Sequence, residues 1–272
     1  MDEVIRRWSQ DKINLLCKYA KAYSGILSKT SWEYVYIDAF AGYGEFVTDK
    51  NIKVPGSPIA VLEIEPPFTE YYFFDVDQEN YQNLKALCGS RDNVYIYWGD
   101  CNKMIPELVF PNITKEQGRK GLCFLDPKGI HIDWKLVELA GKLQTIEVLI
   151  HFSIYDLRRN IFPHKKSKIK DNEIQRMNKF WGDNSWQDIK GDIQSDLFDE
   201  EDTHIADKNI LEAYKNRLQA IANFRYVSDP LPMKTEGNSV LYYLIFATQN
   251  RTGLKIINDI FKKYLKSGNR NG

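Results

Sequence analysis

Two hydrophobic periods alternate along this chain. Short apolar runs, typical of buried strands, are separated by segments in which apolar residues recur at three- and four-residue steps, typical of amphipathic helices. The pattern predicts a first helix over residues 3–28, strands at 34–40, 71–75, 94–98, 121–125 and 147–152, and helices between them at 59–65, 78–88, 103–109 and 134–142. Strands that alternate with helices in this way predict a parallel sheet covered by helices on both faces.

Two of these helices begin with capping signals. Ser57 followed by Pro58 predicts that Ser57 is the N-cap of the helix at 59–65 and that Pro58 occupies its first position. Asp77 is placed to cap the helix at 78–88 in the same way.

The alternation ends in the last part of the chain. Residues 224–228 and 240–247 are apolar runs that flank a turn-rich segment at 236–239, and no helix fits between them. They are expected to pair as an antiparallel hairpin. Five parallel strands followed by a hairpin, seven strands in all, is the plan of the class I methyltransferase fold, a Rossmann-like α/β architecture. A plain dinucleotide-binding domain more often continues the alternation.

Residues 156–205 follow neither pattern. They are expected to form an insertion after the fifth strand, packed on or beside the carboxyl edge of the sheet. Six of the thirteen residues at 158–170 are Lys or Arg, and an acidic block follows at 199–202. The basic run suits contact with a phosphate backbone, and it equally suits a solvated loop. We therefore expect one domain over residues 1–272 with an inserted, partly basic subdomain.

Composition narrows the classes of function. Lys and Arg total 37, as do Asp and Glu, so the chain has no net charge. Any contact with nucleic acid therefore requires a local patch of basic residues. No apolar run approaches the ~20 residues of a membrane helix, and residues 1–7 lack the apolar core of a signal peptide, so a cytoplasmic protein without membrane contact is expected. The cysteines are scattered without zinc-ligand spacing, so we expect no metal site and buried, reduced thiols at Cys17, Cys88, Cys101 and Cys123.

Polar residues follow four of the predicted strands, at the edge where open α/β sheets bind their ligands. After the first strand, Gly42 and Gly44 allow a sharp turn whose backbone amides can approach a ligand. Asp38 and Phe40 lie just before these glycines, and Asp38 is expected to accept hydrogen bonds from an ammonium group, directly or through water. The alternative is an ordinary glycine turn after a strand.

The next two strand ends suit the remainder of an adenosine ligand. Asp75 is expected to accept both ribose hydroxyls, which leaves Asp77 as the helix cap. Asp100 is expected to accept from an adenine amino group, with Cys101 or Asn102 offering adjacent contacts. A structural cap remains the alternative role for Asp100.

The fourth strand end is Asp126-Pro127-Lys128-Gly129. The Asp126 carboxylate and the Pro127 carbonyl provide two acceptors that suit a substrate amine, because they hold its hydrogens and turn its lone pair toward an electrophilic methyl group. A strong base is not needed for such a transfer. The alternative is a β-to-α turn in which Asp126 caps a helix.

Together these motifs resemble those of class I S-adenosylmethionine methyltransferases, and Asp126-Pro127 is similar to the Asp-Pro-Pro-Tyr motif of enzymes that methylate exocyclic amino groups of nucleobases. A closer resemblance over nearly the whole chain is to the three-Cys-motif partner proteins, a family named for a neighbouring radical-SAM-like protein that carries three cysteines. It rests on Trp8-Ser9 with Lys12, 36–42, 56–58, 124–127, 180–183 with Trp186, 230–233 and 241–247. The class I motifs imply S-adenosylmethionine as cofactor. The resemblance to the three-Cys-motif partner proteins implies a methyltransferase-like fold and that neighbouring protein as a partner, and the family name itself gives no reaction.

The sequence departs from the amine-methylating motif at its third and fourth positions. Lys128 and Gly129 stand there, so the aromatic residue that would stack on a base is missing; such stacking contributes roughly 1–3 kcal/mol. Lys128 suits a phosphate or carboxylate, or is solvated. Lys128 and Gly129 are still expected to contact the substrate. The other candidates are Tyr43, Phe152 and Tyr155, which could supply an aromatic face, and Arg158, Arg159 and the lysines of 165–170.

The leading hypothesis is S-adenosylmethionine-dependent methylation of an amino group, on a nucleic-acid base, with Asp126 and Pro127 at the reacting centre. A rival is a non-catalytic module that keeps the fold and binds the neighbouring protein. A third is another enzyme with an adenosine ligand on a similar sheet, against which the predicted hairpin argues.

Overall fold

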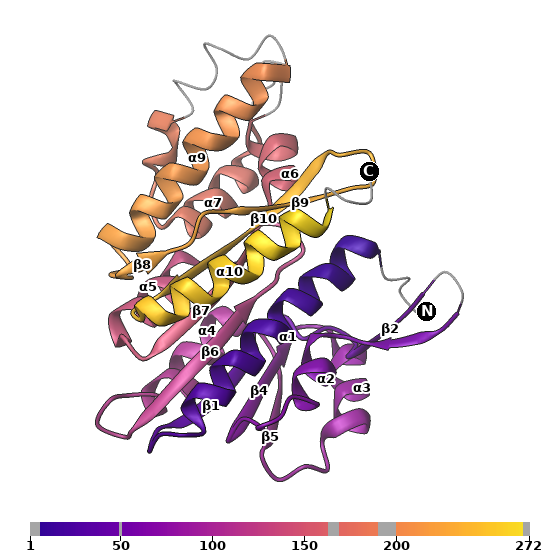
Figure 1. Cartoon of the computed structure of the whole chain (residues 1–272). Coiled ribbons are helices and arrows are strands. Elements are labelled where there is room, and N and C mark those ends of the chain that lie inside the picture. The colour runs from indigo at the N-terminus through magenta and orange to yellow at the C-terminus, as the bar shows by residue number, and fades with distance from the viewer. Residues whose placement is uncertain (1–5, 49–50, 163–168, 190–199, 269–272) are drawn as a thin grey trace.

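The computed structural model describes residues 6–48, 51–162, 169–189 and 200–268, with the backbone alone for residues 200–206 and 268. One mixed sheet organises the described chain (Figure 1). Its strand order is β5-β4-β1-β6-β7-β10-β8, with β9 also pairing with β10. The strands are β1 (Glu33–Asp38), β4 (Glu70–Asp75), β5 (Val94–Trp98), β6 (Arg119–Leu125), β7 (Ile146–Phe152), β8 (Tyr226–Val227), β9 (Leu231–Lys234) and β10 (Val240–Thr248).

The strand directions confirm the predicted fold class. β1 pairs in parallel with β4 and β6, β4 with β5, and β6 with β7. β10 runs antiparallel to β7 and to its other two partners. The strand order reverses at β1, so the crevice between β1 and β6 is the topological switch point at which such sheets bind ligands.

The terminal hairpin differs from the prediction in its residues. β9 pairs with β10 across the turn at 235–239, while β8 pairs separately with the far end of β10 at Ala247 and Thr248. The sheet therefore contains eight strands instead of seven. Pro230, which has no N–H to donate to a ladder, lies in the break between β8 and β9.

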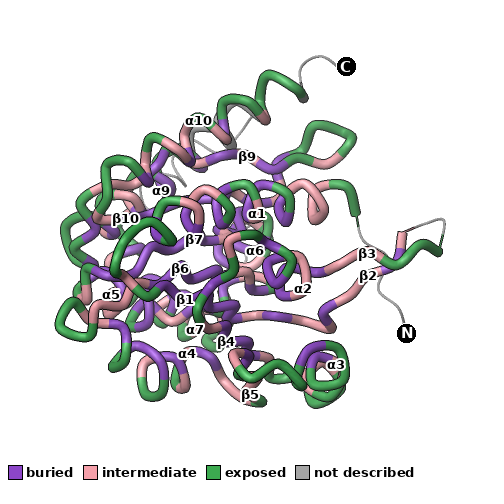
Figure 2. Tube along the Cα trace, turned by 60° about the horizontal axis from the view of Figure 1, so that its bottom comes forward, coloured by how far each residue is buried: buried purple, intermediate pink, exposed green. Residues whose placement is uncertain are grey.

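Helices cover both faces, and alternate strand residues belong to two separate apolar cores. Tyr34 and Tyr36 of β1 pack in one core, Val35 and Ile37 in the other. The first face carries α1 (Arg7–Leu27), α2 (Ser57–Leu62), α3 (Gln78–Cys88) and α10 (Arg251–Gly268); α1 and α10 cross it side by side (Figure 1). The second face carries α4 (Cys101–Met104), the helical turns η1 (Ile105–Val109) and η2 (Phe110–Asn112), α5 (Trp134–Leu143), α6 (Ile154–Asp156), η3 (Leu157–Ile161), α7 (Asp171–Trp181) and α9 (Glu200–Ala220). Figure 2 shows mainly buried strands between helices whose outer sides are exposed.

The stretch predicted as a polar insertion contributes to the second core. Phe180 and Trp181 of α7 and Trp186 beyond it are almost fully buried. The ring of Phe180 stacks on Tyr214 of α9 with centroids 5.3 Å apart. Residues 163–168 of the basic run and Asp199 of the acidic block lie outside the described residues.

Three further features bear on the predictions. A small antiparallel pair, β2 (Glu45–Val47) and β3 (Lys53–Pro55), lies between β1 and α2, where the sequence pattern predicted no strand. The four cysteines are free; three are buried and Cys17 is half-buried. None of the helices in the described part of the chain combines the length and the apolar character needed to cross a membrane.

Candidate active site

One cleft of about 1180 Å³ lies at the carboxyl ends of the parallel strands. Gly42, Asp75, Asp100 and Asp126, from the turns after β1, β4, β5 and β6, all line it. The predicted meeting of these four turns in a shared cleft is therefore confirmed. The volume exceeds that of an ordinary small-molecule pocket, roughly 300–1,000 Å³, so a nucleotide-sized cofactor and part of a second ligand fit together.

The two glycines after β1 have different positions. Gly42 lines the cleft with φ +65°, and a Cβ there would meet nothing within 4 Å, so its backbone is open to a ligand. Gly44, at φ +88°, is not among the lining residues; its carbonyl accepts a 2.7 Å hydrogen bond from the Gly56 amide. Gly44 thus holds the turn against α2, while Gly42 faces the cleft.

Asp75 connects the glycine turn to the start of α3. Its Oδ2 accepts a 2.8 Å hydrogen bond from the Gly42 amide, and its Oδ1 accepts from the Asp77 amide at 2.8 Å and from Asn80 Nδ2 at 3.1 Å. Asp77 caps α3 by accepting from the amides of Glu79 and Asn80, as predicted. Asp75 lines the cleft with its carboxylate oriented by these donors.

Asp100 has both of the roles that the sequence left open. It caps the short helix α4 by accepting from the Asn102 amide at 3.0 Å, and it lines the cleft. Cys101 also lines the cleft, with burial raising the pKa of its thiol, so it remains protonated. Asn102 bridges to the neighbouring loop, donating to the His131 carbonyl and accepting from the Asp133 amide.

Asp38 does not reach the cleft surface. Its side chain is fully buried and accepts from Tyr36 Oη at 3.1 Å, from the Phe40 amide at 3.4 Å and from the Ser57 hydroxyl. Burial raises the pKa of Asp38 to about 7. Of the two predicted contacts with an ammonium group, the direct one is wrong, because Ser57 and Phe40 line the cleft at this point and Asp38 lies behind them. The contact through water stays a prediction.

Ser57 has a different local role from the one predicted. Gly56 is the N-cap of α2, and Ser57 is the first helical residue. The reason is that the Ser57 hydroxyl donates to Asp38 and so does not cap its own helix. The helix begins one residue earlier than the capping signal indicated.

Asp126 makes two strong contacts at the floor of the cleft. Lys12 Nζ of α1 lies 2.5 Å from its Oδ2 and 2.6 Å from its Oδ1, and His151 Nδ1 of β7 lies 2.6 Å from Oδ1. Burial opposes ionisation of this carboxyl, but the charge of Lys12 and the hydrogen bond with His151 outweigh it and hold the pKa of Asp126 below its usual range. The carboxylate is ionised and already paired. Pro127 beside it lines the cleft, as predicted.

Tyr242 of β10 completes this cluster. Its ring lies on the His151 imidazole with centroids 4.0 Å apart, and its hydroxyl donates to the Trp8 carbonyl at 2.9 Å. Lys12 Nζ lies 5.2 Å from the centre of the same ring. His151 and Tyr242 were not predicted as site residues; a lone histidine inside the apolar strand run at 147–152 was the available signal.

The residues predicted to contact a substrate divide into two groups. Lys128 and Tyr155 line the cleft, and the Tyr155 side chain is 53% exposed. Phe152 is fully buried and packs against Phe180 and Tyr214, so its prediction as a substrate contact is wrong: on β7 it points to the core face opposite the cleft residue His151.

Two arginines and a glycine also lie away from the cleft lining. Arg158 pairs with Asp207 of α9, with Nε 2.9 Å from Oδ1, and Arg159 is exposed but is not among the lining residues. Gly129, at φ +101°, belongs to the loop after β6 and does not line the cleft. None of these three is among the residues that line the cleft, and their substrate contacts stay predictions.

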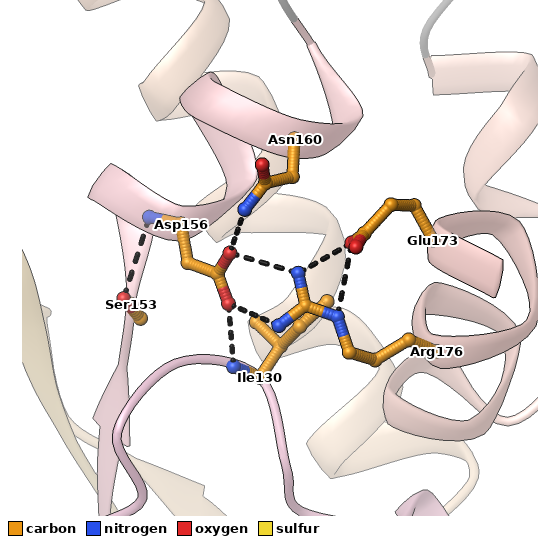
Figure 3. A network of polar contacts seen from close by, with 6 residues as sticks. All are labelled: Ile130, Ser153, Asp156, Asn160, Glu173 and Arg176. Atoms are coloured by element: carbon orange, nitrogen blue, oxygen red, sulfur yellow. Dashed lines mark hydrogen bonds and ion pairs between the residues drawn. The ribbon is translucent and has the colours of Figure 1, made fainter. Parts of the chain in front are cut away.

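A polar network joins the loop after β6 to α7 (Figure 3). Asp156 accepts from the Ile130 amide at 2.9 Å and from two nitrogens of Arg176 at 2.7 and 2.9 Å. Arg176 also pairs with Glu173, and Asn160 donates to Asp156. Burial opposes ionisation of Asp156, but Arg176 and these hydrogen bonds lower its pKa, so the network stays charged. It fixes the position of the Asp126 loop relative to α7.

One wall of the cleft comes from α7, within the segment 156–205 that was expected to pack on or beside the carboxyl edge of the sheet. Its individual residues were not predicted as site residues. Asn172, Gln175, Arg176 and Lys179 face the cleft from this helix. With Lys128 and Tyr155 they form a wall of amides, cations and one exposed aromatic ring. Gly42, Asp75 and Asp100 line the same cleft, where the two carboxylates offer hydrogen-bond acceptors.

The cleft fits an adenosine-containing cofactor. The open backbone at Gly42 admits close approach, and the acidic side chains of Asp75 and Asp100 offer acceptors for hydroxyl and amino groups. Among the described side chains, no group of three or more His, Cys, Asp or Glu residues is placed to hold a metal ion.

Comparison with known proteins gives matches to solved structures alone. No family model and no curated protein matches the chain. Protein LPL1258 of Legionella pneumophila shares 10% sequence identity over 91% of each chain, with a TM-score of 0.48. TYW2 of M. jannaschii, solved in complex with AdoMet, shares 12% over 89% of this chain and 76% of its own, with a TM-score of 0.39. A dimethyladenosine transferase from Plasmodium falciparum shares 12% over 88% and 62%, with a TM-score of 0.38. The function is therefore argued from the site, and the resemblance to three-Cys-motif partner proteins stays a prediction.

Proposed function

We propose that this protein is an S-adenosylmethionine-dependent methyltransferase. The observation that carries the proposal is the convergence of the four strand-end turns, with Gly42, Asp75, Asp100 and Asp126, on one cleft at the switch point of the sheet. The acceptor-rich end suits the cofactor, and the wall from α7 suits a second substrate.

Each part of the cofactor has a candidate site. The Gly42 turn and Ser57 would hold the methionine end, with Asp38 behind Ser57. Asp75 would hold the ribose and Asp100 the adenine amino group. When bound, the cofactor supplies an electrophilic methyl group on a positively charged sulfur.

For the acceptor we propose a nucleic acid. Lys128 and Lys179 place cations at the α7 side of the cleft, and the exposed ring of Tyr155 offers a stacking surface there. An amine held by Asp126 was predicted from the sequence. The pairing of Asp126 with Lys12 and His151 does not favour this role, because the carboxylate is already neutralised.

Calorimetry with S-adenosylmethionine and S-adenosylhomocysteine tests the proposal. One-to-one binding of both, with ATP and NAD as competitors that fail to displace them, is the expected result. Absence of binding would favour the non-catalytic partner module, and preference for ATP or NAD would favour another adenosine-ligand enzyme. Asp126→Ala is expected to keep cofactor binding and lose transfer; loss of both would remove Asp126 from the reacting centre.

A further inference from the structure

The buried contacts of Asp126 assign a role to His151. We propose that His151 Nε2 accepts the proton of the group that is methylated, and that this group is a hydroxyl, the 2′-hydroxyl of RNA. The inference rests on the proposed function and names its acceptor class.

The geometry leaves one ring nitrogen of His151 for this task. Nδ1 is held by Asp126 Oδ1 at 2.6 Å, and a carboxylate partner favours the tautomer with the proton on Nδ1. Nε2 then carries the lone pair. Within the described residues it has no hydrogen-bond partner, and His151 lines the cleft. The ring of Tyr242 holds the imidazole plane.

The charges around the ring keep it neutral. Lys12 faces it from α1, Asp126 from the loop after β6 and Tyr242 from β10. Burial lowers the pKa of His151, the hydrogen bond with Asp126 opposes this, and the Lys12 charge adds to the lowering, with a net decrease. Because Lys12 neutralises Asp126, the imidazole is an unprotonated base near pH 7.

A hydroxyl group as methyl acceptor would use the neutral His151 as its base, whereas an exocyclic amine would not need it. In the transfer the acceptor oxygen forms a bond to the methyl carbon as the carbon–sulfur bond breaks, and the sulfur keeps that electron pair as a neutral thioether. The O–H bond breaks in the same event, and its proton moves to Nε2 and later to water. In the amine transfer expected from the sequence, Asp126 would hold an amine hydrogen, but both of its oxygens already contact Lys12 or His151.

The lining of the cleft selects RNA among hydroxyl compounds. Lys128, Lys179 and the exposed Tyr155 suit a nucleotide with a phosphate and a base. DNA carries no hydroxyl within the strand. An RNA nucleotide therefore fits both features of the cleft. Its 2′-hydroxyl can give a proton to His151 Nε2, and its phosphate and nucleobase suit the side chains along α7.

The first test does not depend on catalysis. Nitrogen-15 NMR of the full-length protein, with the His151 signal assigned by its loss in His151→Gln, reports the tautomer and the protonation state. The Nδ1–H tautomer, neutral at pH 7, is expected. An Nε2–H tautomer, or an imidazolium at pH 7, would overturn the proposal whether or not cofactor binds.

The second test identifies the acceptor atom. Unmodified transcripts of ribosomal and transfer RNA are incubated with methyl-labelled S-adenosylmethionine, digested to nucleosides and analysed by mass. Three results together support the proposal. Wild type yields ribose-methylated nucleosides, His151→Gln transfers methyl groups at least 100-fold more slowly, and the cofactor affinity of this variant stays within threefold of wild type. The Gln amide can still donate to Asp126, so the variant keeps the fold's contact while removing the base.

The remaining outcomes separate this inference from the proposed function. Methylated base nitrogens, or cofactor binding without any labelled ribose, would overturn the hydroxyl acceptor while leaving the methyltransferase standing. Absence of cofactor binding in the calorimetry would remove the proposed function itself. Because burial and the Lys12 charge lower the pKa of His151, the wild-type rate should fall only at a pH below the range in which a free imidazole titrates, where Nε2 becomes protonated. A flat profile would also count against His151.

Discussion

The Lys12 ammonium and the Asp126 carboxylate, 114 residues apart in the chain, form an ion pair with atoms 2.5 Å apart at the floor of the cleft. The side chains are only 10% and 18% exposed, so the pair is largely shielded from water. It joins the N-terminal helix to the reacting end of the sheet. A substitution at either residue therefore acts on both stability and the charge state of His151.

Lys12→Gln is expected to lower the free energy of unfolding by about 2–4 kcal/mol, because it leaves a buried carboxylate with His151 as its main partner. The pKa of His151 should rise, since the Lys12 charge that disfavours its protonation is gone. Urea unfolding and NMR titration measure the two effects. Lys142→Gln, at an exposed ion pair with Glu138, is the control and should cost under about 1 kcal/mol. Equal losses in the two variants would contradict the importance assigned to the Lys12 pair.

The raised pKa of the buried Asp38 carboxyl predicts that the free energy of unfolding depends on pH. Its pKa is about 7 in the folded protein and 3.8 ordinarily, because burial disfavours the charge. Between these values the folded state holds a proton that the unfolded state lacks. The stabilisation of the folded state by this proton is fully present below about pH 3.8. It is lost as the pH rises through about 7, and the free energy of unfolding falls by up to ~1.4 kcal/mol per pH unit.

Asp38→Asn isolates this effect, because Asn cannot ionise. Its amide oxygen can accept from the Phe40 amide in place of Oδ1, and its Nδ2 can donate to the Tyr36 hydroxyl in place of Oδ2. Its free energy of unfolding, measured in urea from pH 5 to 8, should increase relative to wild type as the pH rises. The other carboxyls are the same in both proteins, so their contributions cancel. Parallel curves for the two proteins would show that Asp38 is ionised throughout this range.

Asp75→Asn tests the cofactor end of the cleft. The amide would place a donor where the carboxylate now accepts from Gly42, Asp77 and Asn80, which disturbs both the glycine turn and the proposed ribose contact. Calorimetry should show S-adenosylmethionine bound about 10- to 100-fold more weakly, roughly 1.4–3 kcal/mol. Glu79→Gln, an exposed change in the first turn of α3, should stay within twofold. If both bind alike, the cofactor lies elsewhere.

Gly129→Ala tests the loop that carries Asp126. A Cβ at Gly129 would lie 2.4 Å from Asp156 Oδ2, inside the network of Figure 3, and the backbone φ of +101° is unfavourable for alanine. We expect the free energy of unfolding to fall by about 2–4 kcal/mol and methyl transfer to drop at least tenfold.

Gly118→Ala is the matched control. Gly118 also has a positive φ, +67°, but a Cβ there meets nothing within 4 Å. Gly118→Ala should lower the free energy of unfolding by about 1 kcal/mol and leave methyl transfer unchanged, since the substitution introduces backbone strain alone. If the two variants behave alike, the contact between Gly129 and Asp156 does not control the loop.

The sequence predicted local elements well and long-range contacts poorly. Helix α3 (Gln78–Cys88) and strand β5 (Val94–Trp98) match their predicted bounds, because their hydrophobic periods are set within each segment. Strands β2 and β3 have three residues each, too few to show a period. The gathering of the polar turns was predictable because parallel strands present their carboxyl ends at the same edge of the sheet.

Side-chain roles at the site depended on neighbours that no local pattern reveals. Asp38 is covered because Ser57 turns toward it. His151 contacts Asp126 because β6 and β7 are adjacent, and Lys12 contacts Asp126 because α1 lies across this face of the sheet. The strand order had to be known before these three contacts could be stated.

Phe152 and Tyr155 were equal candidates for an aromatic face in the sequence, and the structure separates them. Phe152→Ala should lower the free energy of unfolding by about 3–5 kcal/mol, because it removes a fully buried ring between Phe180 and Tyr214. Tyr155→Ala should change stability by less than about 1 kcal/mol, because its side chain is 53% exposed. Urea unfolding measures both.

The activity of the same two variants should show the opposite order. Tyr155→Ala is expected to weaken the interaction with RNA by roughly 1–3 kcal/mol, the contribution of one stacked base, seen as a higher KM for RNA with calorimetric affinity for S-adenosylmethionine unchanged. Folded Phe152→Ala, assayed below its unfolding temperature, should keep the wild-type KM. An unchanged KM in Tyr155→Ala would remove that ring from the acceptor site, and a raised KM in Phe152→Ala would show that the core beneath β7 shapes it.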